Sequence, residues 1–279
     1  MHFGVHLPQV GRKASADAIR TAAQQAEALG YDSVWVNDHL AVPSDAPYPP
    51  SPSFFEPVVT LTWAAAATAR VGLGTSVLVL PLRHPVHLAK EIATLDLLSS
   101  GRVTMGVGVG WLEGEFAAVG QQFAGRGAWS DDAIATLRAC WSQDPVQYKP
   151  AKVRSELAGI RTLPQPGRHI PIWVGGTSEP ALRRAETLGD GWHGTALDVE
   201  RTRPIVRRLK ASTDADFVVS MRRSWDALAD DQDDIRRELA AFADMGVDYI
   251  TIEPRQRHLD DWLRAVEATW SIVSDWHSG

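Results

Sequence analysis

The stretch Val71–Glu115, VGLGTSVLVLPLRHPVHLAKEIATLDLLSSGRVTMGVGVGWLEGE, decides the fold of this chain. Val71–Val77 is a continuous apolar run that is too short for a buried helix and typical of a strand covered on both faces. Val103–Val109 is a second such run, and the residues between them recur at helical spacing, at Leu88, Ile92, Leu95 and Leu98. Two strands joined by a helix run parallel, with a right-handed crossover. The stretch therefore predicts a βαβ unit.

The same alternation of strand and helix signals continues along the whole chain. The predicted strands are His2–Leu7, Ser33–Val36, Val71–Val77, Val103–Val109, Ile170–Val174, Asp190–Gly194, Phe217–Met221 and Val247–Ile252. Helical patterns follow each of them, including Ser130–Trp141, whereas residues 144–170 show no clear element. Eight such pairs in 279 residues favour a closed barrel over an open doubly wound sheet. We expect a single α/β domain over residues 1–279, a (β/α)8 TIM barrel.

Composition excludes several classes of protein. The net charge of -6, with no basic stripe, argues against a nucleic-acid partner. Cys140 is the single cysteine, so no internal disulfide can form and a reducing compartment is expected. No signal peptide is evident, and no apolar run approaches the ~20 residues that span a bilayer. These features predict a soluble cytoplasmic protein.

The loops after barrel strands carry the chemistry, so residues at strand ends are the candidates. Asp38 and His39 close the second strand, where a carboxylate beside an imidazole can transfer protons; the structural alternative is a loop cap beside a packed histidine. His6 ends the first strand and is expected to face the same pocket. His84 and His87 have no third ligand at suitable spacing, so no metal site is predicted.

Two glycine-rich turns and one tryptophan complete the candidates. Gly106–Gly110 lacks the spacing of a dinucleotide-binding fingerprint and is weak evidence alone. Gly175-Gly176-Thr177 enters a helix directly, so its amides suit a cofactor phosphate, although it could be an ordinary entry turn. Trp111 follows the first turn and is expected to lie against a ligand. A carboxylate in place of Gly176 is expected to weaken cofactor binding without disturbing the fold.

With these residues in view, the chain resembles the bacterial-luciferase-like superfamily, within it the branch that uses the deazaflavin coenzyme F-420. The resemblance covers most of the chain in order. Its pieces are Asp38-His39, Leu73–Val77, Arg83-His84-Pro85 with Ala89-Lys90, Leu95-Asp96, Ser100-Gly101-Arg102, Gly106–Gly110 with Glu115, Arg126-Gly127, Val174-Gly175-Gly176 and Gly189–Trp192.

The resemblance implies a specific site and assembly. A non-prolyl cis peptide, at Thr75-Ser76 or Ser76-Val77, would support the cofactor ring. Asp38 and His39 match the catalytic pair of the sugar-phosphate dehydrogenases of this branch. The cofactor-binding residues would be Thr75, Ser76, Val77, Gly108, Gly110, Glu115, Gly175, Gly176 and Thr177, joined by Trp111. A homodimer is usual in the family.

The function expected is hydride transfer between coenzyme F-420 and a small organic substrate, with His39 moving a proton and Asp38 holding its tautomer or the cofactor ring. Two departures argue against glucose 6-phosphate as that substrate. Trp111 stands where the sugar-phosphate dehydrogenases carry a glutamate, and Ala41-Val42-Pro43 stands where they carry a tryptophan. The alternatives are an FMN-dependent monooxygenase and a flavin-binding barrel without turnover. The sequence does not identify the substrate.

Overall fold

The computed structural model describes residues 1–277 and forms one closed barrel of eight parallel strands in chain order. β1 pairs with both β2 and β8, which closes the ring. The strands are β1 (His2–His6), β2 (Ser33–Val36), β3 (Gly72–Val79), β4 (Val103–Gly108), β5 (Ile172–Gly175), β6 (Gly191–Thr195), β7 (Val218–Arg223) and β8 (Tyr249–Ile252). The predicted (β/α)8 barrel is confirmed.

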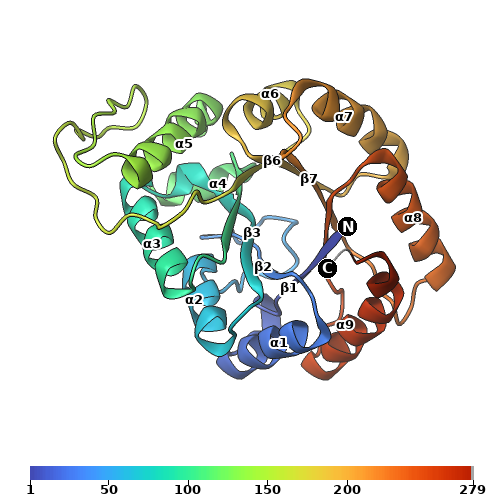
Figure 1. Cartoon of the computed structure of the whole chain (residues 1–279). Helices are drawn as coiled ribbons and strands as arrows, with labels where there is room; N and C mark the ends of the chain where they lie inside the picture. Colours follow the sequence, from blue (N-terminus) through green and yellow to red (C-terminus); the bar gives the residue numbers. More distant parts are fainter. Residues whose placement is uncertain (278–279) are drawn as a thin grey trace.

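Helices surround the barrel as an outer ring (Figure 1), and the Met1 amino group lies 3.3 Å from the Trp276 carbonyl oxygen, so the first strand and the last described turn are side by side. The helices are α1 (Ala16–Leu29), α2 (Pro57–Ala67), α3 (Pro85–Leu98), α4 (Glu113–Ala118), α5 (Arg126–Ser142), α6 (Glu179–Leu188), α7 (Val199–Ser212), α8 (Gln232–Met245) and α9 (Leu259–Val273). Three short 3-10 turns are η1 (Gly11–Lys13), η2 (Leu80–Leu82) and η3 (Ser274–Trp276). Within residues 1–277, none of the helices combines the length and the apolar character needed to cross a bilayer.

Local signals set where the helices begin and end. The Ser15 hydroxyl accepts a hydrogen bond from the Ala18 amide and caps α1, and Gly30 ends that helix at a φ of 103°. Asp231 caps α8 in the same way, and Gly246 ends it at a φ of 92°. These ends can be recognised in the sequence because a polar cap and a left-handed glycine each depend on the type of a single residue.

Aromatic rings fill the middle of the barrel. The Trp35 indole occupies space left by two glycines, since a Cβ at Gly4 or Gly74 would lie only 2.3 or 2.4 Å from it. Trp35 stacks on Trp173, with centroids 5.3 Å apart, and on His193, with centroids 5.4 Å apart and planes at 6°. This stack forms a rigid floor beneath the loops at the carboxyl ends of the strands.

The structure differs from the sequence prediction after β4 and along β3. The helix α4 was not expected, because it is short and its buried apolar contact is limited to Phe116. The next helix begins at Arg126, whereas Ser130 was predicted. The residue before it, Gly125, has no side chain that could cap the helix, so this end is not marked in the sequence. β3 continues to Val79 because its register with β4 shifts between Thr75 and Leu78. Residues 144–170 contain no helix or strand, as expected.

Candidate active site at the barrel mouth

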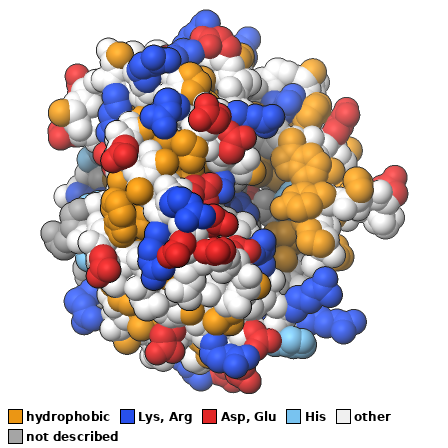
Figure 2. All heavy atoms as spheres, turned by 90° about the vertical axis from the view of Figure 1, so that its right-hand side faces the viewer, with side chains coloured by type: hydrophobic (Ala, Val, Ile, Leu, Met, Phe, Trp, Pro, Cys, Tyr) orange, Lys and Arg blue, Asp and Glu red, His pale blue; other side chains and the backbone are white. Residues whose placement is uncertain are grey.

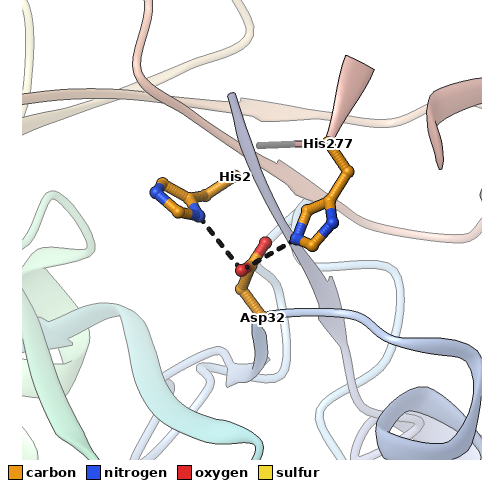
Figure 3. A group of neighbouring side chains, drawn as sticks. All are labelled: His2, Asp32 and His277. Carbon is orange, nitrogen blue, oxygen red and sulfur yellow. Dashed lines mark hydrogen bonds and ion pairs between the residues drawn. The ribbon is translucent and has the colours of Figure 1, made fainter. Parts of the chain in front are cut away.

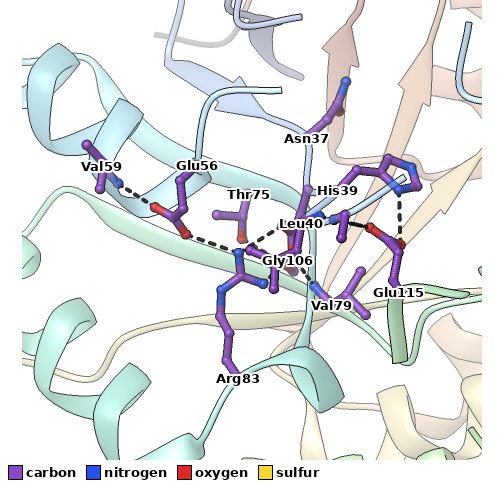
Figure 4. A network of polar contacts seen from close by, with 12 residues as sticks. Asn37, His39, Leu40, Glu56, Val59, Thr75, Val79, Arg83, Gly106 and Glu115 are labelled. Carbon is purple, nitrogen blue, oxygen red and sulfur yellow. Dashed lines mark hydrogen bonds and ion pairs between the residues drawn. The ribbon is translucent and has the colours of Figure 1, made fainter. Parts of the chain in front are cut away.

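His39 lies in the loop after β2, and a buried carboxylate from α4 holds it. The His39 Nδ1 atom is 3.1 Å from Oε2 of Glu115, whose residue is only 2 % exposed. Oε1 of Glu115 accepts hydrogen bonds from the amides of Leu40, at 2.8 Å, and Ala41, at 3.2 Å. Figure 4 shows Glu115 reaching from α4 to this loop. A carboxylate oxygen opposite Nδ1 favours the tautomer in which Nδ1 donates to Glu115, and this tautomer leaves Nε2 available for chemistry.

Asp38 has a different environment from its neighbour. Its carboxylate accepts hydrogen bonds from both terminal nitrogens of Arg83, at 2.5 and 2.9 Å, and from the Val79 amide at 2.8 Å. Burial raises the pKa of the Asp38 carboxyl, against the opposing effect of the Arg83 cation. Arg83 also binds Glu56, which caps α2 through the Val59 amide (Figure 4). Asp38 therefore fastens the loop to β3 and α2.

This arrangement bears on two expectations. The carboxylate hydrogen-bonded to His39 belongs to Glu115, whereas Arg83 and Val79 bind the carboxylate of Asp38. Glu115 is buried beside the loop, and its part in binding a cofactor stays a prediction. Both residues lie at the predicted site.

The bulge of β3 projects into the mouth and contains a non-prolyl cis peptide between Ser76 and Val77, as the resemblance predicts. The Ser76 carbonyl accepts a hydrogen bond from Arg222 at 3.0 Å, and its hydroxyl is 2.7 Å from Nε2 of His193. The Thr75 hydroxyl donates to the Gly106 carbonyl at 2.7 Å. The bulge is thus fixed from three strands, and the half-buried Val77 side chain forms part of the surface of the mouth.

The glycines of β4 and β5 make room for this bulge. A Cβ at Gly106 would lie 2.0 Å from the Thr75 carbonyl oxygen, and a Cβ at Gly108 would lie 2.7 Å from the Val77 side chain. A Cβ at Gly175 would lie 3.0 Å from the same valine. The small residues expected to admit a ligand therefore make room for the bulge itself, that is for the Thr75 carbonyl and the Val77 side chain, and a ligand would rest on Val77.

Polar side chains at the ends of the neighbouring strands β7, β8, β1 and β2 line the mouth above the aromatic floor. The Nε atom of Arg222 lies 3.0 Å from Oε2 of Glu253. The side-chain amide of Asn37 donates a hydrogen bond to the other oxygen of the same carboxylate at 2.9 Å. Despite burial, the nearby Arg222 cation lowers the pKa of Glu253 to about 2. Burial, aided by Arg222, lowers the pKa of His6 to about 3, and burial likewise lowers the pKa of His193 to about 3. Both imidazoles are neutral at physiological pH.

His6 was expected at this site from its place at the end of the first strand, whereas His193, Arg222 and Glu253 were not. His193 lies two residues beyond Gly191 on one face of β6, so the two-residue period of a strand was the available signal. Arg222 lies on β7 one residue beyond the predicted end of that strand, and Glu253 directly follows β8. Polar residues just past a predicted strand end were the signal for these two.

The turn Gly175–Thr177 leads into α6 as expected. Gly176 has a φ of 111°, and Thr177 is exposed ahead of the helix. Ser178 precedes the first turn without capping it by its side chain. The expectation that the fold tolerates aspartate at Gly176 is wrong, because a Cβ there would lie 2.9 Å from that of Ala181 in a left-handed conformation.

Aromatic and aliphatic side chains surround His39 on its solvent side. Its ring lies 5.0 Å from that of Phe54 and 6.0 Å, edge-on, from that of Trp111. Trp111 is 53 % exposed and Tyr48 is 54 % exposed, with their rings 6.0 Å apart. Figure 2 shows hydrophobic side chains gathered beside a hollow on one face of the molecule. An apolar rim around a mouth lined by a few polar side chains suits a flat organic ligand.

The described residues fit a flavin-like group. Within residues 1–277, both ring nitrogens of His6 and the Asn37 Oδ1 are buried without a hydrogen bond of normal geometry, and the two side chains interact only weakly with each other. Buried polar atoms are normally paired, so these await a polar ligand or water. Val77 and Gly175 provide the apolar surface beside them. Among the residues that the structure describes, neither His84 nor His87 lies in a group of side chains close enough to share a metal ion, and Nε2 of His84 is 3.0 Å from the Ser155 hydroxyl.

Comparison with known proteins agrees with a site for a flavin-like group. The sequence profile of the luciferase-like monooxygenase family matches residues 1–271. An F420-dependent glucose-6-phosphate dehydrogenase of Amycolatopsis mediterranei is 31% identical over 238 residues, which cover 78% of this chain and 69% of that protein.

Two solved structures share the fold. An F420-dependent secondary alcohol dehydrogenase in complex with an F420-acetone adduct aligns with a TM-score of 0.81 at 18% identity, covering 99% of both chains. A monooxygenase of Streptomyces bottropensis aligns with a TM-score of 0.82 at 20% identity, covering 100% of both chains. The barrel, the bulge of β3 and the family profile together show that this chain belongs to the luciferase-like monooxygenase family.

Proposed function

We propose that this protein is an oxidoreductase that transfers a hydride between coenzyme F-420 and a small organic substrate. The observation that carries the proposal is the His39–Glu115 pair at the mouth of the barrel. The relative that uses F420, at 31% identity, supports this choice of cofactor. Coenzyme F-420, when bound, supplies the hydride chemistry, and the protein supplies position and protons.

The residues of the mouth have separate tasks in this proposal. His39 takes or gives a proton at Nε2, because Glu115 fixes the other ring nitrogen and stabilises the protonated ring. The Ser76-Val77 bulge would support the cofactor ring, and His6 and Asn37 would bind its polar atoms. The amides of the Gly175–Thr177 turn would bind the phosphate, aided by the dipole of α6. The rim at Trp111 excludes water from the substrate.

The second candidate is an FMN-dependent monooxygenase, which the name of the family and the Streptomyces structure favour. The same floor would accept FMN, since the two cofactors share a tricyclic ring and a phosphate. The third candidate is a barrel that binds flavin without turnover. It leaves the imidazole of His39, which Glu115 orients, without a function. We rank it last for that reason.

Titration of the cofactor-free protein with F-420 and with FMN distinguishes the candidates. We expect F-420 to bind at least about tenfold more tightly, which corresponds to about 1.4 kcal/mol. FMN binding of equal or higher affinity, with oxygen consumption in the presence of reduced FMN, would establish the monooxygenase instead. Tight binding of F-420 with no absorbance change across a panel of small alcohols, aldehydes and sugar phosphates would favour the binding protein.

We also propose that the chain forms a homodimer through α2. This helix carries no charged residue between Pro57 and Ala67, although Val59 is 69 % and Trp63 46 % exposed. A surface helix normally presents charged side chains to water. An uncharged outer face is instead typical of an interface between subunits.

A further inference from the structure

Three side chains from distant parts of the sequence meet at the amino-terminal end of the barrel. His2 begins β1, Asp32 precedes β2, and His277 follows the last turn η3. Oδ1 of Asp32 lies 3.0 Å from Nδ1 of His2 and 3.1 Å from Nε2 of His277. Figure 3 shows both imidazoles pointing at this one oxygen. No other three His, Cys, Asp or Glu side chains in residues 1–277 come as close.

Packing holds each donor in place. The His2 ring stacks on Tyr249 with centroids 5.7 Å apart, and the His277 ring lies edge-on to Trp270 at 5.5 Å. The second oxygen of Asp32 accepts a hydrogen bond from the Phe3 amide at 2.6 Å. Ligating carboxylates in metal sites are commonly supported by such an outer hydrogen bond. The three groups are therefore oriented by residues that do not themselves ligate.

We propose that His2, Asp32 and His277 bind one divalent transition-metal ion of the zinc class. The three donor atoms lie within 4.8 Å of one another. Two ligands of a tetrahedral zinc ion with bonds of about 2.0–2.1 Å are separated by about 3.3 Å, close to both distances from the Asp32 oxygen. The His2 side chain is half in solvent, so a small shift of its ring along the stack with Tyr249 would close the remaining gap.

The donor set selects the kind of ion. Two imidazoles and one carboxylate suit Zn²⁺, Co²⁺ or Ni²⁺, whereas Mg²⁺ and Ca²⁺ prefer a shell of oxygens. Water would complete the coordination on the exposed side. The site lies at the opposite end of the barrel from His39, where residues of TIM barrels contribute to stability and not to catalysis. The ion would join the first strand to the last turn and so hold the barrel closed.

The competing explanation is a clasp of hydrogen bonds in which both imidazoles donate to Asp32 and no ion binds. Calorimetric titration of the tag-free full chain with ZnCl₂, after treatment with a chelator, separates the two. We expect one equivalent of Zn²⁺ to bind and CoCl₂ to give the visible absorption of low-coordinate cobalt. His277→Gln should weaken binding by at least about tenfold, as loss of a ligand does, and His2→Gln should do the same.

His87→Gln is the matched control, because this exposed histidine on α3 touches no residue of the site. It should bind zinc like the parent protein. Zinc should also raise the melting temperature of the parent protein and of the control, but not of His277→Gln. The proposal would be overturned if His277→Gln bound zinc as tightly as the parent protein, or if MgCl₂ raised the melting temperature as much as ZnCl₂. It would also be overturned if the variants differed from the parent in melting temperature only when no metal was present. Cofactor affinity is measured separately and should not change in any variant.

Discussion

Asp38 and His39 are neighbours in the chain with opposite surroundings. The carboxylate of Asp38 is enclosed by Arg83 and Val79, while the imidazole of His39 keeps one nitrogen toward the mouth. Adjacent residues in an extended loop point to different sides, so one stabilises the loop and the other is free for chemistry. A mutation of Asp38 should therefore affect the stability of the loop, whereas a mutation of His39 should affect the chemistry.

Replacing His39 by alanine should reduce turnover by roughly 10²–10⁴-fold, the usual contribution of a proton-transfer group. Cofactor affinity should change little, because the floor and the bulge of β3 remain. Steady-state kinetics with an identified substrate, together with a cofactor titration, measure the two effects. His87→Ala is the control for loss of a histidine. Turnover retained in His39→Ala would return this residue to a structural role.

The buried imidazoles predict how stability depends on pH. Burial lowers the pKa of His6 and of His193 to about 3 in the folded protein, against an ordinary value near 6.5. Between these values the unfolded chain binds more protons than the folded one, so the free energy of unfolding should fall as the pH is lowered. Each such histidine contributes at most about 1.4 kcal/mol per pH unit in that window.

Urea unfolding of the cofactor-free protein at pH 7 and pH 5 tests this dependence. His6→Gln should show a smaller loss between the two conditions than the parent protein, since it removes one of the two groups. His258→Gln, at an exposed position before α9, should behave like the parent. An unchanged slope in His6→Gln would mean that other groups govern the acid sensitivity.

The sequence allowed the Asp38-His39 pair to be found, but not the partner of each. Glu115 lies 76 positions from His39, and the contact forms only because α4 follows β4 at the same end of the barrel. Arg83 likewise reaches Asp38 from the turn after a different strand. Single-sequence reasoning detects residues at strand ends, whereas their pairing depends on packing between strands.

At the scale of elements, the bulge of β3 and the glycines of β4 fit one another. Gly108→Ala should destabilise the protein by about 1–3 kcal/mol, because the new Cβ would overlap the Val77 side chain. Val77→Ala in the same chain should recover most of that loss, since it removes the overlapping methyl groups. Chemical unfolding of the two single variants and the double variant measures the coupling.

Gly167→Ala is the control, because a Cβ there meets no atom within 4 Å. It should leave the free energy of unfolding nearly unchanged. If the changes in the free energy of unfolding caused by Gly108→Ala and Val77→Ala were additive, the glycine would not be needed to make room for Val77. The bulge itself was predicted from family resemblance and not from periodicity, since a one-residue shift in register leaves no mark in an apolar run.

Elements with a strong period or a clear cap were predicted best. The helix α1 lies between two clear signals of this kind, the Ser15 cap before it and the left-handed Gly30 after it. The short helix α4 was missed because two acidic residues and one buried phenylalanine do not make a periodic pattern. Such an element is stabilised by its contacts, here through Glu115, and not by propensity.

At the scale of the whole molecule, the uncharged face of α2 predicts association. The double change Val59→Lys with Trp63→Lys should convert the homodimer to a monomer, because charged side chains would be buried at the interface. Light scattering coupled to gel filtration at micromolar concentration measures the mass. Leu228→Lys changes an equally exposed apolar residue away from this helix and should leave the mass unchanged. A monomeric parent protein would contradict the proposal.

The closed barrel could be predicted because it is the sum of eight similar signals, each tolerant of an error of a few residues. The arrangement of the mouth could not, because His6, Arg222 and Glu253 come from strands at the two ends of the chain. Their meeting follows from closure, which pairs β1 with β8. The same closure brings His2 to His277 at the opposite end.

The stacked indoles in the barrel have an optical consequence. Trp35 and Trp173 lie 5.3 Å apart with their planes at 26°, close enough for their electronic transitions to couple. The near-ultraviolet circular dichroism of this pair would therefore report on the barrel interior, separately from the far-ultraviolet signal of the surrounding helices. A solution condition that abolished the first signal and kept the second would mark a protein whose outer ring persists around a loosened centre.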